Sequence, residues 1–125
     1  MKKRSQPNAR VVMVTAPNQR DASAIARTLV DENLAACVNI LGPIRSIYRW
    51  QNAIEDEAEF LLLIKTRSAI CARLEQRVKE LHSYDVPEVI ALPIETGSAQ
   101  YLAWLTEATT PMRTEKRRRT RAARS

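Results

Sequence analysis

Three side chains of this sequence could bind a metal ion. His82 is the only histidine and stands in the segment LHSYDVPE, six residues before Glu88, while Cys37 ends the segment AAC. A thiolate suits Cu(I) or Zn²⁺, and imidazole and carboxylate groups suit other divalent ions. The sequence has no HxxxH or CxxC motif, so these residues predict weak binding of Cu²⁺ or another divalent cation. Several copies of the chain could complete such a site, since one ligand per copy then becomes several.

Each of these residues also has an ordinary structural interpretation. Free cysteine is among the most buried residue types and packs as a small hydrophobe, which is the role we favour for Cys37. A histidine at a helix end can instead satisfy the terminal carbonyl groups, and His82 is placed for that role.

A second group of polar and aromatic residues could line a ligand-binding cleft. Tyrosine and tryptophan are also common anchors of protein–protein interfaces, so interface packing is the alternative, and the one we favour. The group comprises Tyr48, Trp50, Lys65, Tyr84 and Glu88.

Familiar enzyme motifs are missing from the sequence. Glycine occurs only at Gly42 and Gly97, which excludes a GxGxxG motif and a Walker A loop. A single histidine leaves no nucleophile with an evident base. We therefore expect no enzyme activity and no tightly bound cofactor.

The positive charge lies at the two ends of the chain. Residues 1–10 hold four basic residues and no acids, and residues 113–125 hold seven basic residues against Glu115 alone. The whole chain carries +6, so residues 11–112 are acidic. We expect one folded domain over 11–112 between two solvated basic tails, with nucleic acid binding, if any, confined to the tails.

The remaining composition favours a cytoplasmic protein. No apolar run approaches the length of ~18 residues that a membrane span needs, and no apolar secretion signal precedes the first strand. Two cysteines, Cys37 and Cys71, are too few for a disulfide framework.

These residues must be positioned by seven predicted elements. The first are a strand at 11–15 and a helix capped by Asn18. Two strands follow, one from Leu34 through a bend at Gly42-Pro43 to Gln51 and one from Ile54 to Thr66. The last three are a helix capped by Ser68, an edge or bulged strand from Val86 to Ile94, and a short helix capped by Ser98. The order β-α-β-β-α-β-α indicates an α+β, ferredoxin-like fold with an extra C-terminal helix.

The apolar stripes of the three helices predict their buried faces. The residues are Ala22, Ile25, Ala26, Leu29 and Val30 in the first helix, Ile70, Leu74, Val78 and Leu81 in the second, and Tyr101, Leu102, Trp104 and Leu105 in the third.

The two middle strands predict a long hairpin. Asn52-Ala53 is the candidate two-residue loop, which would place Arg49 opposite Asp56. The segment FLLLI (60–64) is apolar on both faces and must be covered on both, yet the helices are too short to cover the whole hairpin. A partner subunit would resolve this mismatch.

The segments ENLAACVNILGPIRSIYRW (32–50), HSYDVPEVIALPI (82–94) and YLAWL (101–105) together resemble the divalent-cation tolerance protein CutA family, over about Val11 to Ala108. The resemblance implies a homotrimer, a role in tolerance to divalent metals and weak copper binding. Cysteines that some members carry fall at Val14 and Arg77 here, which weakens the copper expectation.

Two other functions share this predicted fold. A PII-like small-molecule sensor is also a trimer of ferredoxin-like subunits, but the domain lacks a glycine-rich or basic phosphate loop. An RNA-recognition domain stacks bases on strand aromatics, whereas the corresponding strand EAEFLLLI (57–64) offers only Phe60.

Overall fold

The computed structural model of the chain describes residues 8–110. Its elements are strand β1 (Ala9–Ala16), helix α1 (Gln19–Asp31), strands β2 (Cys37–Trp50) and β3 (Ala53–Arg67), helix α2 (Ser68–Leu81), strand β4 (Val89–Pro93) and helix α3 (Ala99–Ala108). This is the predicted element order. The predicted basic tails lie outside the described residues except at residues 8–10, where β1 begins.

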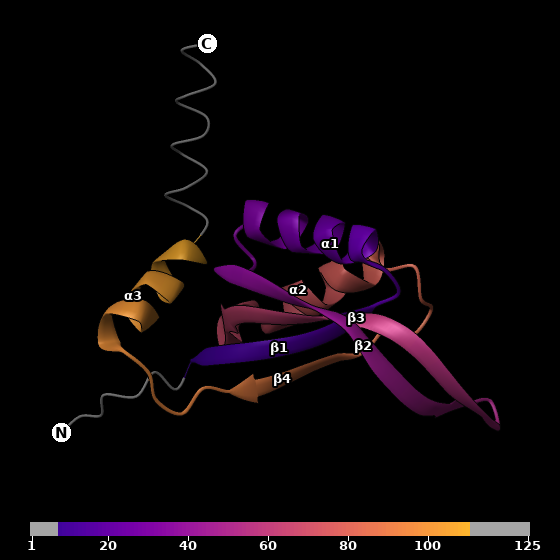
Figure 1. Cartoon of the computed structure of the whole chain (residues 1–125). Coiled ribbons are helices and arrows are strands. Elements are labelled where there is room, and N and C mark those ends of the chain that lie inside the picture. Colours follow the sequence, from indigo (N-terminus) through magenta and orange to yellow (C-terminus); the bar gives the residue numbers. More distant parts are fainter. Residues whose placement is uncertain (1–7, 111–125) are drawn as a thin grey trace, which may run out of the picture.

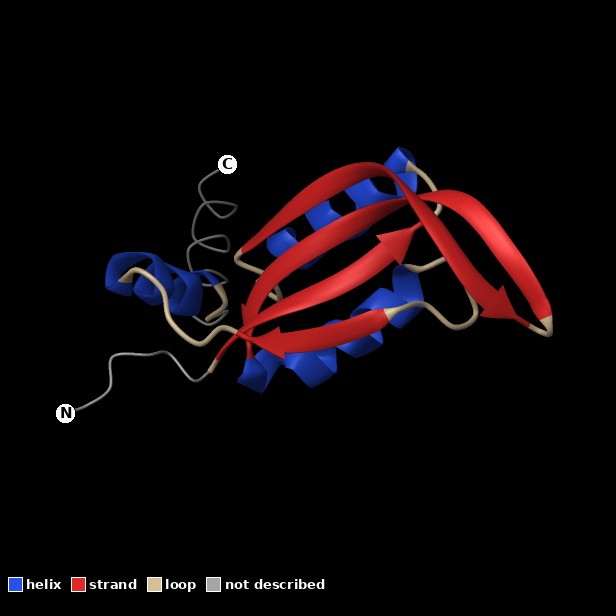
Figure 2. Cartoon of the chain, turned by 60° about the horizontal axis from the view of Figure 1, so that its bottom comes forward, coloured by secondary structure: helices blue, strands red, loops and turns tan. Residues whose placement is uncertain are grey.

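The four strands form one antiparallel sheet in the order β2-β3-β1-β4. Helices α1 and α2 lie on one face of this sheet, α3 lies at one end, and the β2–β3 hairpin extends beyond the other end (Figure 1). Figure 2 shows the strands in front of α1 and α2. The fold is therefore α+β, as predicted. Within residues 8–110, no helix is long and apolar enough to cross a membrane.

The main core fills the space between the sheet and the two long helices. Alternate residues of β1 and β3 point toward the helices, because successive side chains of a strand face opposite ways. The fully buried residues of this core include Val12, Val14, Leu29, Leu62, Ile64, Leu74 and Val78. In α1 the predicted stripe is confirmed except at Val30, which is 41% exposed beyond its edge, and in α2 Ile70, Leu74 and Val78 are buried as predicted.

Local capping explains where most helices begin and end. The Asn18 side chain accepts the Asp21 N–H at 2.7 Å, and Ser98 caps α3 in the same way at Tyr101. Asn33, at φ 60°, takes the predicted left-handed conformation after α1. The prediction that Ser68 caps α2 was wrong: Arg67 is the N-cap residue, and the Ser68 N–H donates to the Asn8 carbonyl.

The predicted hairpin loop was wrong by one residue. Gln51 and Asn52 form the turn, at φ 49° and 68°, because a two-residue turn of this type needs positive φ at both positions. Arg49 consequently lies opposite Ile54, and Asp56 lies opposite Ile47. Asp56 pairs diagonally with Arg45 instead, at 2.7 Å.

Two strands begin later than predicted. Strand β2 begins at Cys37 rather than Leu34, because the Leu34 and Ala35 N–H groups both donate to the Leu29 carbonyl at the end of α1. Strand β4 begins at Val89 rather than Val86, after a proline that has no N–H to donate. Its position at the edge of the sheet confirms the interpretation of its prolines.

The face of the sheet opposite α1 and α2 is apolar and has no helix over its middle. Leu61 and Leu63 are only half-buried there, so one chain covers the FLLLI segment on one face alone. We call this surface the open face. Its other apolar residues are Val11, Met13, Leu41, Ile90 and Leu92, of which the last three are 45–49% exposed.

Helix α3 covers one end of the sheet with two of the predicted residues. Leu102 and Leu105 are buried in a second small core, but Tyr101 and Trp104 are 41% and 44% exposed. Simple packing of both aromatic rings, which the sequence predicted, is therefore wrong for the single chain. The two rings contact one another instead, with centroids 5.5 Å apart.

The predicted irregularity at Gly42-Pro43 is confirmed by a register shift between Leu41 and Ile44. A Cβ atom at Gly42 would overlap the Phe60 ring, and Phe60 packs against the main core. The bend in β2 therefore requires glycine at position 42, because a side chain there would overlap the Phe60 ring.

We predict that Gly42→Ala lowers stability by about 1–3 kcal/mol, the usual cost of inserting a methyl group into a packed site. Thermal or urea unfolding measures the loss. Gly97→Ala is the comparison variant and should cost less, since its Cβ would lie 3.2 Å from the Leu102 side chain, against 2.4 Å from the Phe60 ring at Gly42. Adding Phe60→Leu should recover part of the loss, and equal stability of Gly42→Ala and wild type would contradict the steric argument.

Candidate functional site

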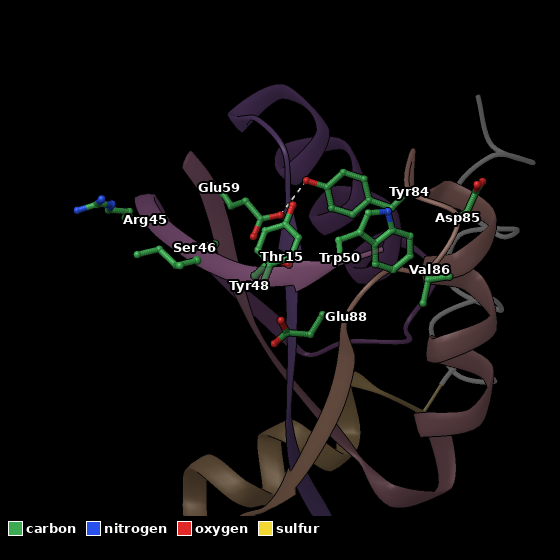
Figure 3. Close-up of a pocket in the computed structure, with 11 residues that line it drawn as sticks. Thr15, Arg45, Ser46, Tyr48, Trp50, Glu59, Tyr84, Asp85, Val86 and Glu88 are labelled. Carbon is green, nitrogen blue, oxygen red and sulfur yellow. Dashed lines mark hydrogen bonds between the residues drawn. The ribbon is translucent and has the colours of Figure 1, made fainter. Parts of the chain in front are cut away.

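A cavity of about 760 Å³ lies where the β2–β3 hairpin leaves the body of the sheet. One wall is β2, another is β3 with the end of β1, and the segment between α2 and β4 closes the third side (Figure 3). We call it the hairpin pocket. It is lined by Thr15, Arg45, Ser46, Ile47, Tyr48, Trp50, Glu59, Tyr84, Asp85, Val86 and Glu88.

A buried carboxylate forms the inner wall of the hairpin pocket. Glu59 is only 5% exposed, and the Tyr84 hydroxyl donates to its Oε2 at 2.7 Å (Figure 3). Burial and this hydrogen bond to a carboxylate both raise the pKa of Tyr84 well above its usual value. Tyr84 therefore stays a neutral hydrogen-bond donor to the Glu59 carboxylate.

Further glutamates of β3 lie beside the pocket, on the hairpin. Glu55, Glu57 and Glu59 alternate along β3, so they share the face that carries Tyr48 of β2. The Tyr48 hydroxyl donates to Glu57 at 3.1 Å, and desolvation followed by these carboxylates raises the pKa of Tyr48. The potential around both pocket tyrosines is therefore negative.

Arg45 is the basic residue of the pocket lining, and its charge is already compensated. Its guanidinium makes two hydrogen bonds to Asp56, at 2.9 and 2.7 Å, and its side chain is 74% exposed. Such bidentate pairing fixes the guanidinium away from the inner carboxylate. The pocket consequently lacks an unpaired cation among the residues that line it.

His82 supports the pocket from behind rather than lining it. One ring nitrogen, Nδ1, accepts the Tyr84 N–H at 3.1 Å, so the other, Nε2, carries the proton and donates to the Thr15 carbonyl at 2.7 Å. Both nitrogens are therefore occupied in the neutral imidazole. The ring connects β1 to the segment that carries Tyr84, so His82 has a structural role, but the carbonyl it satisfies belongs to β1 and not, as predicted, to the end of its own helix.

Cys37 lies on the open face, away from the hairpin pocket. Its Sγ is 3.8 Å from the Lys65 ammonium and 3.9 Å from the Asn39 and Tyr101 side-chain oxygens. Lys65 also donates to Asn39. These polar neighbours differ from the apolar setting expected after two alanines, because the odd-numbered residues of β2 up to Leu41 face outward from the core.

The structure therefore separates the three predicted metal ligands. Glu88 lines the hairpin pocket, His82 stands behind it, and Cys37 lies on the open face. Across residues 8–110, no group of three or more histidine, cysteine, aspartate or glutamate side chains is placed to hold a metal ion. The structure does bring the predicted polar and aromatic group together, since all of its members except Lys65 line the hairpin pocket.

Sequence reasoning missed Glu59 as a pocket residue. Glutamates alternate along β3, which indicates that one face of the strand is acidic, but the alternation does not show which of them is buried. Burial of Glu59 comes from the loop that places Tyr84 over it, a contact 25 residues apart in the chain. No local signal marks that contact.

Comparison with known proteins identifies the family. Residues 10–108 match the family model described as the CutA1 divalent ion tolerance protein. The chain belongs to the CutA1 family. The expected family membership is thereby confirmed, and the matched residues contain all of the hairpin pocket and every helix and strand except the first residue of β1.

Individual relatives support this membership. The divalent-cation tolerance protein CutA of Thermus thermophilus is 50% identical over 99 residues, which cover 79% of this chain and 96% of the relative. Human protein CutA is 47% identical over 96 residues, and this chain spans 54% of its length. The Thermus thermophilus relative is named for divalent-cation tolerance and not for a catalysed reaction.

Solved CutA structures share the fold as well as the sequence. The Thermus thermophilus CutA1 structure superposes with a TM-score of 0.79 at 49% identity, over 80% of this chain and 97% of that chain. A structure described as the periplasmic divalent cation tolerance protein CutA from Archaeoglobus fulgidus also has a TM-score of 0.79, at 40% identity, over 81% of this chain and 98% of that chain.

We predict that the tyrosines of the folded protein ionise later than free tyrosine. The chain has three tyrosines, and the environment raises the pKa of each of them. Absorbance at 295 nm against pH should therefore rise above the ordinary midpoint of about 10. Tyr84→Phe should remove the component that ionises last, whereas a normal midpoint for all three would contradict the acidic, desolvated setting.

The same pKa shift makes stability depend on alkaline pH. The unfolded chain releases the Tyr84 proton near pH 10 while the folded protein retains it, so this stabilisation is complete below that pH and is lost as the pH rises above it. Tyr84→Phe should flatten the decline in a set of urea unfolding curves measured above pH 10.

Proposed function

We propose that this CutA-family chain is a cytoplasmic, homotrimeric protein of ferredoxin-like subunits that contributes to tolerance of divalent metal ions by binding them weakly. The observation that carries the proposal is the match to the divalent ion tolerance family across residues 10–108. The strand order β2-β3-β1-β4 is compatible with a ferredoxin-like subunit. In a reducing compartment the free thiols of Cys37 and Cys71 would persist.

The open face supports the trimer part of the proposal. A monomer rarely exposes a contiguous apolar surface of this kind, because burial of apolar area is the main driving force for association. The tip of the hairpin, where Ile47 and Ile54 are 60% and 62% exposed, is a second exposed apolar surface. Both could be covered by neighbouring copies of the chain.

Carboxylates are the metal ligands that the geometry supports best. Glu88 is exposed at the hairpin pocket, whereas both nitrogens of His82 are engaged and Cys37 stands apart. Oxygen ligands in small number give weak binding, and trimer assembly would multiply the carboxylates available. We keep Cu²⁺ as the first ion to test and His82 and Cys37 as the competing ligands.

The sensor function receives no support from the pocket chemistry. A phosphate-bearing ligand needs unpaired basic groups or a glycine-rich loop. The hairpin pocket instead presents carboxylates, and its arginine is paired with Asp56.

We predict that the purified protein has three times the mass of one chain in light scattering at micromolar concentration. The mass should not change with EDTA, since apolar strand surfaces and not metal bridges would join the subunits. Leu92→Glu, on the open face, should lower the mass, while Val30→Glu on the outer side of α1 should not. A monomer mass for wild type would refute the trimer, and dissociation by EDTA would make the metal structural.

We predict that Glu88→Gln weakens Cu²⁺ binding about threefold or more in calorimetric titration, because the number of charged ligands sets the affinity of such sites. Cys37→Ser should change it less than twofold. His82→Ala should lower the melting temperature, because two partly buried hydrogen bonds are lost, with little direct effect on Cu²⁺. Copper binding abolished by Cys37→Ser in a stable protein would assign the metal to the thiol instead.

A further inference from the structure

The hairpin pocket holds a buried negative charge without a compensating cation. Glu59 is 5% exposed, and its one hydrogen-bond donor within residues 8–110 is the neutral Tyr84 hydroxyl. None of the ion pairs formed in that part of the chain includes Glu59. A buried carboxylate without a cation is costly, because water no longer stabilises the charge. A positive ligand would remove that cost.

Aromatic side chains complete the wall around this carboxylate. Tyr48, Trp50 and Tyr84 all line the cavity that contains Glu59 (Figure 3). Aromatic faces attract cations and also offer apolar contact area, a combination that proteins use to bind ammonium groups with organic substituents. The cavity volume of about 760 Å³ is ample for a small molecule.

The other classes of ligand fit this chemistry less well. A divalent metal ion needs several oxygen, nitrogen or sulfur ligands, and residues 8–110 contain no such group of acids, histidines and cysteines. Phosphate or carboxylate ligands would be repelled by Glu59 and Glu88, and Arg45 is paired. A neutral apolar ligand would leave the charge of Glu59 buried and unpaired.

We propose that the hairpin pocket binds an organic ammonium ion, with the charged nitrogen at Glu59 and the attached carbon atoms against Tyr48, Trp50 and Tyr84. This proposal goes beyond the metal tolerance function and does not depend on it, since it rests on different residues and a different ligand class. Tyr84 then has a second role: its hydroxyl orients the Glu59 carboxylate through the 2.7 Å hydrogen bond.

The test uses n-butylammonium chloride as the probe and the fluorescence of Trp50 as the signal. The chain has two tryptophans, so a Trp104→Phe background leaves Trp50 as the reporter, and Trp104 lies on α3 outside the pocket lining. Sodium chloride at equal ionic strength and neutral 1-butanol serve as ligand controls. We expect saturable binding with an affinity on the order of millimolar, as befits so small a molecule.

Glu59→Gln is the deciding variant, since it keeps the shape and an oxygen that can accept the Tyr84 hydrogen bond but removes the charge. It should weaken n-butylammonium binding about tenfold or more, in line with loss of a charged partner. Glu75→Gln makes the same change on the exposed side of α2 and should leave binding unchanged. Thermal melting and light scattering of each variant establish that it is folded and assembled.

Other results would overturn the proposal. They are equal binding of 1-butanol, equal binding by Glu59→Gln, or a fluorescence response to sodium chloride alone. Glu59→Gln should also change Cu²⁺ affinity less than twofold. If it abolishes Cu²⁺ binding while n-butylammonium does not bind at all, the pocket is a metal site, which would leave the tolerance function intact and refute only the organic ligand. If Glu59→Gln fails to fold, Tyr48→Leu provides the second test, with weaker n-butylammonium binding expected.

Discussion

Strand β3 is apolar on both faces over part of its length, and one chain can cover only one of those faces. It is 15 residues long, it pairs with both β1 and β2, and the helices cover only one of its faces. Leu62 and Ile64 are fully buried beneath the helices, while Leu61 and Leu63, pointing the other way, are not. Because alternate side chains must face opposite directions, an apolar run in a central strand produces a core and an apolar outer surface together. The open face, the protruding hairpin and the proposed trimer all follow from this geometry.

The same alternation places the charge of the hairpin pocket. In the first half of β3 the glutamates fall at every second residue, so they lie on one face with Tyr48 of β2, while Asp56 points to the other face and pairs with Arg45. Glu59 is the last of them, where the hairpin meets the body of the sheet and the segment after α2 closes over it. A carboxylate that would be solvated on an isolated hairpin is thereby buried, with a tyrosine hydroxyl as its donor. This buried charge gives the pocket its preference for cations.

Local features of the fold could be predicted, and features that depend on partners distant in the chain could not. The helix stripes, the Asn18 and Ser98 caps and the break at Gly42 depend on neighbouring residues. The hairpin loop was misplaced because Gln51 adopts a positive φ that its residue type does not indicate. Ser68 was predicted to be the N-cap of α2, but it is the first helical residue, and its N–H donates to the Asn8 carbonyl at the start of the described chain. The identities of the candidate residues did not reveal which of them would meet.

The sequence by itself determined the element order, the acidic face of β3, the aromatic residues of β2 and the membership of the CutA1 family. These properties are written in residue types and their spacing, since strand and helix periodicities are set by the backbone. Only the tertiary structure decided that both ring nitrogens of His82 are hydrogen-bonded, that Cys37 lies beside Lys65 and Tyr101 and not at the hairpin pocket, and that Glu59 is buried. The physical reason is that hydrogen-bond partners and burial depend on how loops return to the sheet, and the packing of the whole chain fixes those paths.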